Sequence, residues 1–373
     1  MGYFGAIPMT IPPPSVLDPA EASLIDGVPD APAVFLIHAQ QGAPYLARTA
    51  LLRRRLRRLL KPPASPSRFL RLGAVARRVE YWLTHSSLEA LLLHYELARI
   101  HFPDQYASLL KLRPPVFVCL LMANRFPRTV VTTRLTGGPS VYFGPFRTRA
   151  AAEEFETRML DLFQLRRCQE DLAPSPDHPG CIYGEMGMCL RPCQLIVGEE
   201  EYASEAARVA SFLHTRGQSM LSLVRASRDR FSQELRFEDA AREHKRLEKV
   251  EAVLRLRDEL AADLDRLYGV AITRSAQPSS VTLWFVTAGV FTGPRSFSYA
   301  AAGESVSLDR RLRELAAGVQ PAQAVARRRA EHLALLSRWY YSSWRDGEWL
   351  SFDSLETIPY RRLVHAIHRM AAL

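Results

Sequence analysis

Four cysteines gather in a short stretch of the chain and could together hold one inorganic centre. Cys168, Cys181, Cys189 and Cys193 have the spacing C-x12-C-x7-C-x3-C, whereas the fifth cysteine, Cys119, lies apart. Four thiolates are the ligand set of a tetrahedral zinc ion and of a [4Fe–4S] cluster. The spacing therefore predicts a metal site, but by itself it does not choose between iron–sulfur and zinc.

The composition is that of a basic globular protein. Hydrophobic residues make up 47% and charged residues 24% of the 373 residues, and the formal net charge is +10. Such a charge favours polyanions, either nucleic acid or an anionic membrane surface. No apolar run approaches the ~20 residues that cross a bilayer, and the first residues lack the pattern of a secretory signal. We therefore expect no membrane-spanning segment and no membrane partner, and in a cytoplasmic chain the crowded cysteines would bind metal in preference to forming disulfides.

The pattern of apolar residues predicts the α+β class, with short strands and separate helical stretches. Helices are expected at 87–101, with Ser86 or Ser87 as the N-cap, and over most of 200–262. The strands are expected at 34–37, 79–83, 116–122, 129–134, 268–273, 281–286 and 290–299.

A further helix is expected at 50–60, where apolar and basic residues alternate with helical spacing. Its basic face could grip phosphates, although a merely solvated face would have the same pattern. The arginines predicted to contact DNA in and beside this helix are Arg48, Arg53, Arg54, Arg57 and Arg58.

The residues around the four cysteines resemble the cysteine region of UvrC, a family of bacterial excinuclease subunits. That family has the pattern FPLRxC…PC…GxC…PC, which joins the cysteines to particular neighbours. The resemblance implies a [4Fe–4S] cluster at these positions and so favours iron–sulfur over zinc. The corresponding residues are Phe163-Gln164-Leu165-Arg166-Arg167-Cys168, Gly180-Cys181, Gly187-Met188-Cys189 and Arg191-Pro192-Cys193.

The stretch from Leu235 to Arg242 resembles the core of the UVR motif, FExAAxxRD. In the family this motif forms a helical hairpin that docks on the partner UvrB. Here Glu243 and His244 replace the usual Arg-Asp, and an ordinary buried helix pair is the alternative. The residues expected to contact a UvrB-like partner are Phe237, Glu238, Ala240 and Ala241.

The N-terminal region resembles, in register, the GIY-YIG nuclease domain of the same family. Tyr45 and Arg55 fall on its catalytic tyrosine and arginine. Phe35 falls on the second tyrosine and lacks its hydroxyl, and Tyr106 falls on an asparagine. His94 falls on the glutamate that binds the divalent metal. The resemblance thus implies a nuclease centre in which three positions have degenerated.

Loss of that glutamate predicts loss of metal-dependent cleavage, because hard cations such as Mg²⁺ prefer oxygen ligands. Glu89 and Glu96 do not share the helix face of His94 at ~100° per residue. A lone histidine could still bind a softer metal. Mg²⁺ or Mn²⁺ is expected only if the centre has stayed active.

Residues 268–299 resemble the opening strands of the family's second, RNase H-like nuclease domain, and the resemblance fades after about residue 300. The runs 268–273 and 281–286 contain no acidic residue, so paired carboxylates for two-metal chemistry are missing. An aromatic cluster follows, which could stack on single-stranded bases but is more typical of a core. It comprises Trp339, Tyr340, Tyr341, Trp344 and Trp349.

These features predict a UvrC-like protein of DNA-repair type that binds DNA or a UvrB-like partner. One alternative is an active GIY-YIG endonuclease with an altered metal site, and another is an iron–sulfur scaffold that does not bind DNA. The predicted segments are a lead-in at 1–27, a degenerate nuclease-like domain at 28–110, a linking segment with the cysteines at 111–200, a helical UVR region at 201–265 and a C-terminal domain at 266–373.

Overall fold

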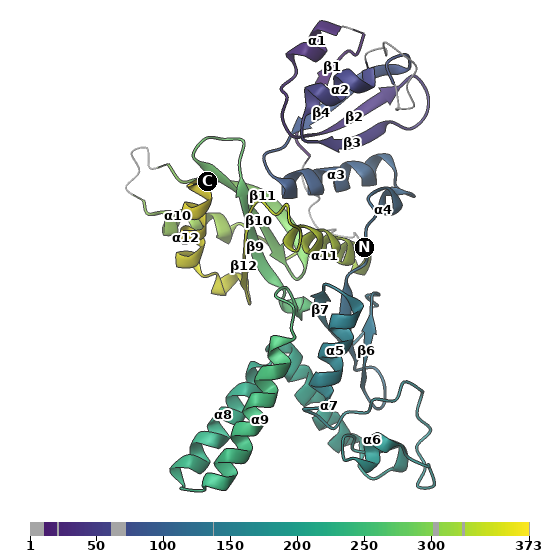
Figure 1. Ribbon diagram of the computed structural model, residues 1–373, viewed down its shortest axis with the longest axis vertical. Coiled ribbons are helices and arrows are strands. Elements are labelled where there is room, and N and C mark those ends of the chain that lie inside the picture. The colour runs from purple at the N-terminus through teal and green to yellow at the C-terminus, as the bar shows by residue number, and fades with distance from the viewer. Residues whose placement is uncertain are drawn as a thin grey trace. The chain divides into compact units, whose positions relative to one another are not determined.

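The computed structural model describes residues 11–20, 22–60, 72–136, 138–300, 306–322 and 325–372. Within these residues the chain forms three four-stranded antiparallel sheets with accompanying helices, which confirms the predicted α+β class (Figure 1). It divides into two compact units. The first unit contains Met1–Arg113, Tyr268–Gln323 and Arg338–Leu373, and the second contains Pro114–Leu267 and Ala324–Ser337.

The N-terminal sheet of the first unit has the strand order β1-β4-β2-β3. Part of the predicted lead-in therefore belongs to the fold, because Ser15–Leu17 pairs as an edge strand with β4. Residues 1–10 of that lead-in lie outside the described part of the chain. The elements are β1 (Ser15–Leu17), α1 (Ala22–Gly27), β2 (Ala33–Ala39), β3 (Tyr45–Thr49), α2 (Leu52–Leu60), β4 (Ala76–Leu83), α3 (Ser87–His101) and α4 (Tyr106–Leu109).

Helices cover both faces of this sheet. Alternate residues of a strand point to opposite faces, and Phe35 and Ile37 pack with Leu52 and Leu56 of α2 in one core cluster. The other face is covered by α3, whose His101 ring contacts the ring of His38. Helix α3 begins at the predicted place, since the Ser86 hydroxyl accepts the Glu89 N–H at 3.1 Å.

The second sheet of the first unit has the order β11-β10-β9-β12. Its first three strands match the predicted runs, and the fourth, β12, was not predicted. The ring of Trp349 on β12 lies against Gly269 on β9, where a Cβ atom would clash with it. The elements are β9 (Tyr268–Arg274), β10 (Ser280–Thr287), β11 (Val290–Ser298), α10 (Leu308–Ala317), β12 (Glu348–Phe352), the 3-10 turn η3 (Leu355–Thr357) and α12 (Tyr360–Ala371).

The second unit carries a sheet of order β6-β5-β7-β8 and the helices that follow it. The rings of Phe143 and Phe155 stack at 5.3 Å in its core, which fixes α5 on the sheet. Helix α11 (Ala326–Tyr340) begins in this unit, and its residues from Arg338 belong to the first. The remaining elements are β5 (Val116–Leu121), β6 (Arg128–Thr132), β7 (Ser140–Phe146), α5 (Arg149–Leu160), α6 (Ile182–Glu185), η1 (Pro192–Gln194), α7 (Glu199–His214), α8 (Gln218–Gln233), α9 (Phe237–Arg255), β8 (Ala262–Asp263) and η2 (Leu264–Arg266).

Of the helices in the described residues, none combines the length and the apolar character needed to span a bilayer.

Candidate functional site

Tyr45 and Arg55, the two nuclease positions that keep their residue types, lie together. Arg55 on α2 donates from Nη2 to the Tyr45 hydroxyl on β3 at 2.9 Å. The Phe35 ring packs beside that of Tyr45, with 6.1 Å between centroids, and it is fully buried. The Nε atom of Arg55 is buried without a hydrogen-bond partner in the described structure. This corner of the sheet thus retains a positioned hydroxyl and a guanidinium with a free donor.

His94 lies on α3 and is not joined to that pair by a hydrogen bond in the described residues. Tyr45 pairs with Ile37, whose side chain faces α2, whereas Arg48 pairs with Val34 on the face covered by α3. Tyr45 and Arg55 therefore lie on the α2 side of edge strand β3, and His94 lies on its α3 side. The structure separates the predicted nuclease residues into two groups.

The surroundings of His94 are basic. Burial, together with the nearby guanidinium groups of Arg48 and Arg338, lowers the pKa of His94 to about 4. Partial burial and the charge of Arg338 also lower the pKa of Arg48. Near neutral pH the imidazole is therefore uncharged between two cations. A divalent cation at this position would be repelled where the family has a metal-binding carboxylate.

The neighbouring carboxylates are engaged elsewhere, as the helical spacing predicted. Glu96 is buried and pairs with Arg99 at 2.8 Å. Glu89 accepts the backbone N–H of His85 at 2.7 Å. Tyr106, at the family's asparagine position, is buried with its ring edge-on to Tyr95. Neither carboxylate replaces the missing metal ligand.

The arginines predicted to contact DNA differ in their surroundings. Arg48 lies on β3 and is not part of the arginine-rich helix. On α2, Arg57 forms an ion pair with Asp26 at 2.8 Å, and Arg53 donates to the Asp26 carbonyl at 3.3 Å. These two tie α2 to the end of α1, while Arg54 and Arg58 are exposed on the same helix. Arg53 and Arg57 of the predicted basic face are therefore engaged in contacts within the protein.

The cysteine region is anchored to the second unit by buried polar contacts. Arg166 is 3% exposed and donates from Nε to the Phe126 carbonyl at 2.9 Å. Its backbone N–H donates to the Tyr202 hydroxyl, which in turn donates to the Pro127 carbonyl at 2.8 Å. These bonds hold the start of the cysteine loop against α7 and the strand β6 region.

Two donors point at cysteine sulfurs. Nη1 of Arg166 lies 3.5 Å from Sγ of Cys168, and the Arg191 N–H lies 3.4 Å from Sγ of Cys189. Cys189 and Cys193 are buried, and burial together with the other thiols of the set raises the pKa of Cys189 to about 11. The Cys189 thiol is therefore within electrostatic reach of the other three, and the sulfurs of Cys168 and Cys189 each accept one hydrogen bond.

No single-ion site is preformed in this region. Among the described residues, no three His, Cys, Asp or Glu side chains are arranged to hold a metal ion. A single zinc needs its sulfurs ~2.3 Å from one point, whereas a [4Fe–4S] cluster bonds each thiolate to a different iron and leaves the sulfurs farther apart. Four thiols, of which Cys168 and Cys189 each accept an N–H donor at sulfur, are a ligand set that a [4Fe–4S] cluster can use.

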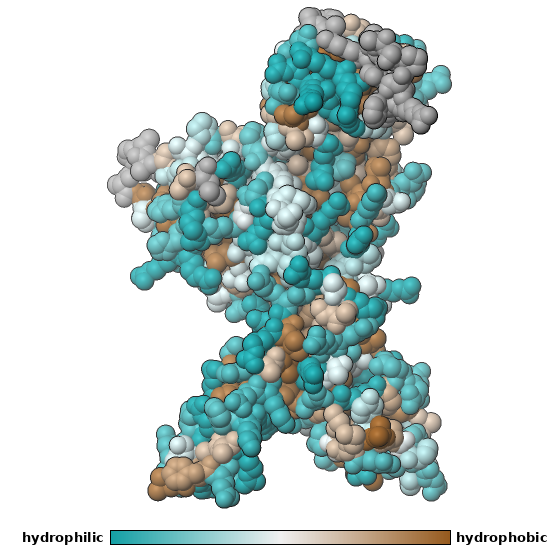
Figure 2. Space-filling model, viewed as in Figure 1, coloured by the Kyte–Doolittle hydropathy of each residue, from teal (hydrophilic) through white to brown (hydrophobic). Residues whose placement is uncertain are grey.

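The predicted UVR segment forms a helical hairpin of α8 and α9. Its base is buried through Met220, Val224, Leu247 and Val250. Its far end is apolar and open, with Phe237 66% exposed and Leu235 72% exposed. Figure 2 shows hydrophobic surface at this end of the hairpin. The partner-facing residues Glu238 and Ala241 are also exposed, and Ala240 is partly so.

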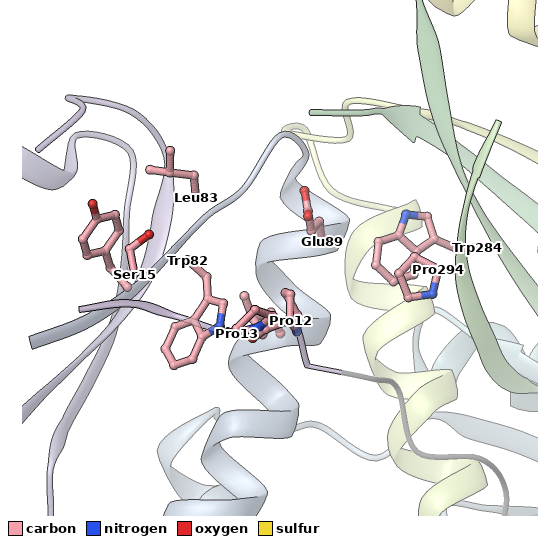
Figure 3. Close-up of a pocket in the computed structure, with 10 residues that line it drawn as sticks. Pro12, Pro13, Ser15, Trp82, Leu83, Glu89, Trp284 and Pro294 are labelled. Atoms are coloured by element: carbon pink, nitrogen blue, oxygen red, sulfur yellow. Dashed lines mark hydrogen bonds between the residues drawn. The ribbon is translucent and has the colours of Figure 1, made fainter. Parts of the chain in front are cut away.

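The first unit also contains a pocket of about 260 Å³ that the sequence did not reveal (Figure 3). None of the predicted site residues lines it. Burial raises the pKa of Glu89, its single acidic group, against the opposing effects of His85 and Ser86. Its walls are Pro12, Pro13, Ser15, Tyr81, Trp82, Leu83, Leu93, Trp284 and Pro294, with Glu89 among them.

The C-terminal aromatic residues are mostly structural. Trp339 is fully buried, and Arg345 stacks over Tyr340 at 4.4 Å. Trp344 is the most exposed side chain of this aromatic cluster, at 42%. The core interpretation of this cluster therefore holds for Trp339.

Comparisons with known proteins give one consistent result. Residues 116–212 match the model of the UvrC/Cho excinuclease middle domain. The chain is 28% identical over 271 residues to UvrABC system protein C of Moorella thermoacetica, covering 72% of this chain and 44% of that protein. The protein of the same name from Geobacter sp. strain M21 is 26% identical over 280 residues, covering 74% and 43%. That from Salmonella heidelberg is 28% identical over 274 residues, covering 72% and 44%.

The chain spans less than half the length of the curated relatives it matches. No solved structure matched it. The matched middle domain includes β5, α5 and all four cysteines, and so coincides with the region whose motifs first suggested the relationship. The chain is therefore a UvrC-like protein, as its cysteine and UVR motifs predicted.

Proposed function

We propose that this protein takes part in nucleotide excision repair in the cytoplasm as a DNA-binding, UvrC-like component that no longer cuts DNA by metal-dependent chemistry. The observation that carries this proposal is His94, which stands between Arg48 and Arg338 where the family has a metal-binding glutamate. A site with two cations and no carboxylate disfavours Mg²⁺ or Mn²⁺. The same charges favour the DNA backbone.

Two further elements fit such a role. The open apolar end of the α8–α9 hairpin, with Leu235 and Phe237, suits docking on the hairpin of a UvrB-like partner. Cys168, Cys181, Cys189 and Cys193 would hold a [4Fe–4S] cluster, which would supply a rigid cross-link for the loop and a redox-active centre. The Arg166 and Arg191 donors would stabilise its sulfurs.

An active endonuclease is the second candidate, favoured by the intact contact between Arg55 and Tyr45. The decisive experiment incubates the purified protein with nicked, bubble and lesion-bearing DNA in Mg²⁺ or Mn²⁺. We expect binding without cleavage. Cleavage that Arg55→Ala abolishes would overturn the proposal in favour of the nuclease. Absence of DNA binding at low salt would instead favour an iron–sulfur scaffold.

A further inference from the structure

Arg48, His94 and Arg338 form a group of nitrogen donors on the α3 face of the N-terminal sheet. Arg48 on β3 points to the face that α3 covers, and His94 is part of α3. Arg338, from the distant C-terminal part of the chain, is held in place because its Nη1 donates to the Leu110 carbonyl at 2.9 Å. That bond uses one guanidinium nitrogen and leaves the others for a ligand.

The charges of this group are not balanced by the protein. In the described part of the chain, no carboxylate pairs with Arg48, His94 or Arg338, whereas Arg57 is paired with Asp26 and Arg99 with Glu96. Two neighbouring guanidinium groups without a paired carboxylate in the described residues attract an anion. Guanidinium groups match the geometry of phosphate oxygens through paired hydrogen bonds.

The imidazole of His94 suits the same ligand. It is neutral near pH 7, because burial and the two arginines lower its pKa to about 4. A neutral imidazole offers one N–H donor and adds no further charge. The group can therefore offer hydrogen bonds from three side chains to one tetrahedral anion.

We infer that Arg48, His94 and Arg338 bind a phosphate group at the position where related nucleases hold their metal. This deepens the proposed DNA binding and rests on it. It also gives the C-terminal part of the chain, which lacks a family resemblance beyond about residue 300, a defined role through Arg338. The phosphate could belong to a nucleic-acid strand or to a free phosphate compound.

Fluorescence anisotropy with a labelled oligonucleotide duplex, measured over a range of salt concentrations, tests the site. Arg48→Ala and Arg338→Ala should each weaken binding about 3- to 10-fold and reduce the salt slope by about one. Arg362→Ala, which removes the same charge from an exposed position on α12, is the matched control. Because Arg338→Ala also loses the contact with Leu110, Arg338→Lys is included and should recover part of the affinity.

The substitution His94→Glu tests the same site by adding a negative charge in place of removing a positive one. A carboxylate here should offset one of the two positive charges, weaken oligonucleotide binding and favour Mn²⁺ binding, as detected by calorimetry with the metal alone. Calorimetry with inorganic phosphate distinguishes the two sources of the bound phosphate group. If inorganic phosphate binds as tightly as the duplex, the site binds free phosphate compounds. If it binds much more weakly, the site binds the phosphates of a nucleic-acid strand. If the wild type binds neither, the proposed DNA binding also fails. If it binds DNA and both arginine variants behave like Arg362→Ala, only the inferred phosphate site is wrong.

Discussion

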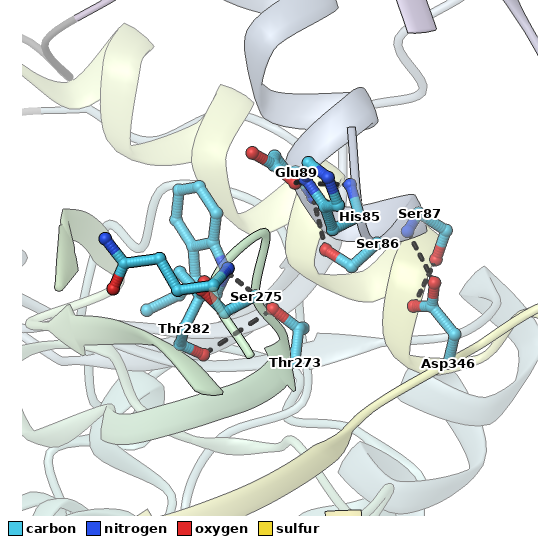
Figure 4. A network of polar contacts seen from close by, with 10 residues as sticks. His85, Ser86, Ser87, Glu89, Thr273, Ser275, Thr282 and Asp346 are labelled. Carbon is cyan, nitrogen blue, oxygen red and sulfur yellow. Dashed lines mark hydrogen bonds and ion pairs between the residues drawn. The ribbon is translucent and has the colours of Figure 1, made fainter. Parts of the chain in front are cut away.

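The first residue of α3, Ser87, is bonded to Asp346, which lies 259 residues later in the chain. Both the backbone N–H and the hydroxyl of Ser87 donate to the Asp346 carboxylate at 2.5 Å (Figure 4). The first N–H groups of a helix have no partner within the helix, and a carboxylate there also interacts favourably with the helix dipole. The contact joins the N-terminal and C-terminal parts of the first unit.

Asp346→Ala should therefore destabilise the protein. We expect a loss of about 1 kcal/mol in the free energy of unfolding, since both residues are partly open to solvent and the bonds are charge-assisted. Urea unfolding measures it, with Asp104→Ala as a control on an exposed carboxylate. Equal effects of the two substitutions would show that the contact contributes nothing.

The depressed pKa of His94 predicts a dependence of stability on pH. The unfolded chain binds a proton at this side chain near pH 6.5, and the folded chain only near pH 4. The stabilisation is therefore complete above about pH 6.5 and is lost as the pH falls toward 4, by on the order of 1–3 kcal/mol. Unfolding curves of the wild type and His94→Gln should diverge across this range, and parallel curves would contradict the assignment.

The cysteine site makes a spectroscopic prediction. Protein purified without oxygen should be brown and absorb in the visible blue, and Cys189→Ser should lose this absorbance because one iron loses its thiolate. Cys119→Ser is the matched control, since Cys119 is buried in β5 and remote in sequence from the other four. A colourless wild type that contains stoichiometric zinc would rule out the cluster.

Two substitutions in the α8–α9 hairpin should separate its role in partner binding from its role in folding stability. Phe237→Ala should leave the free energy of unfolding within about 0.5 kcal/mol of the wild type, because the ring is 66% exposed. It should weaken binding to a UvrB-like helical hairpin about tenfold or more, as measured by calorimetry. Leu247→Ala, at the buried base, should cost about 2–4 kcal/mol instead. Unchanged partner affinity in Phe237→Ala would remove the apolar end as the docking surface.

Local patterns predicted most of the regular structure. Short, nearly continuous apolar runs identified β2, β5 and β9, and the serine before an apolar helical stretch located the start of α3 correctly. The strands β1 and β12 were missed because neither stands out from its neighbours as an apolar run. They exist because each pairs with a longer strand that is distant in the sequence, β4 and β9 respectively.

The sequence by itself determined the relationship to UvrC, because cysteine spacing and the UVR motif are local properties that survive at 25–28% identity. It also predicted that His94 stands where the family has a metal-binding glutamate. Only the tertiary structure decided what surrounds His94, since Arg48 and Arg338 reach it from a neighbouring strand and from a helix more than 200 residues away. Packing decides which charged groups surround a side chain. It brings together residues that lie far apart in the sequence and that no local sequence pattern connects.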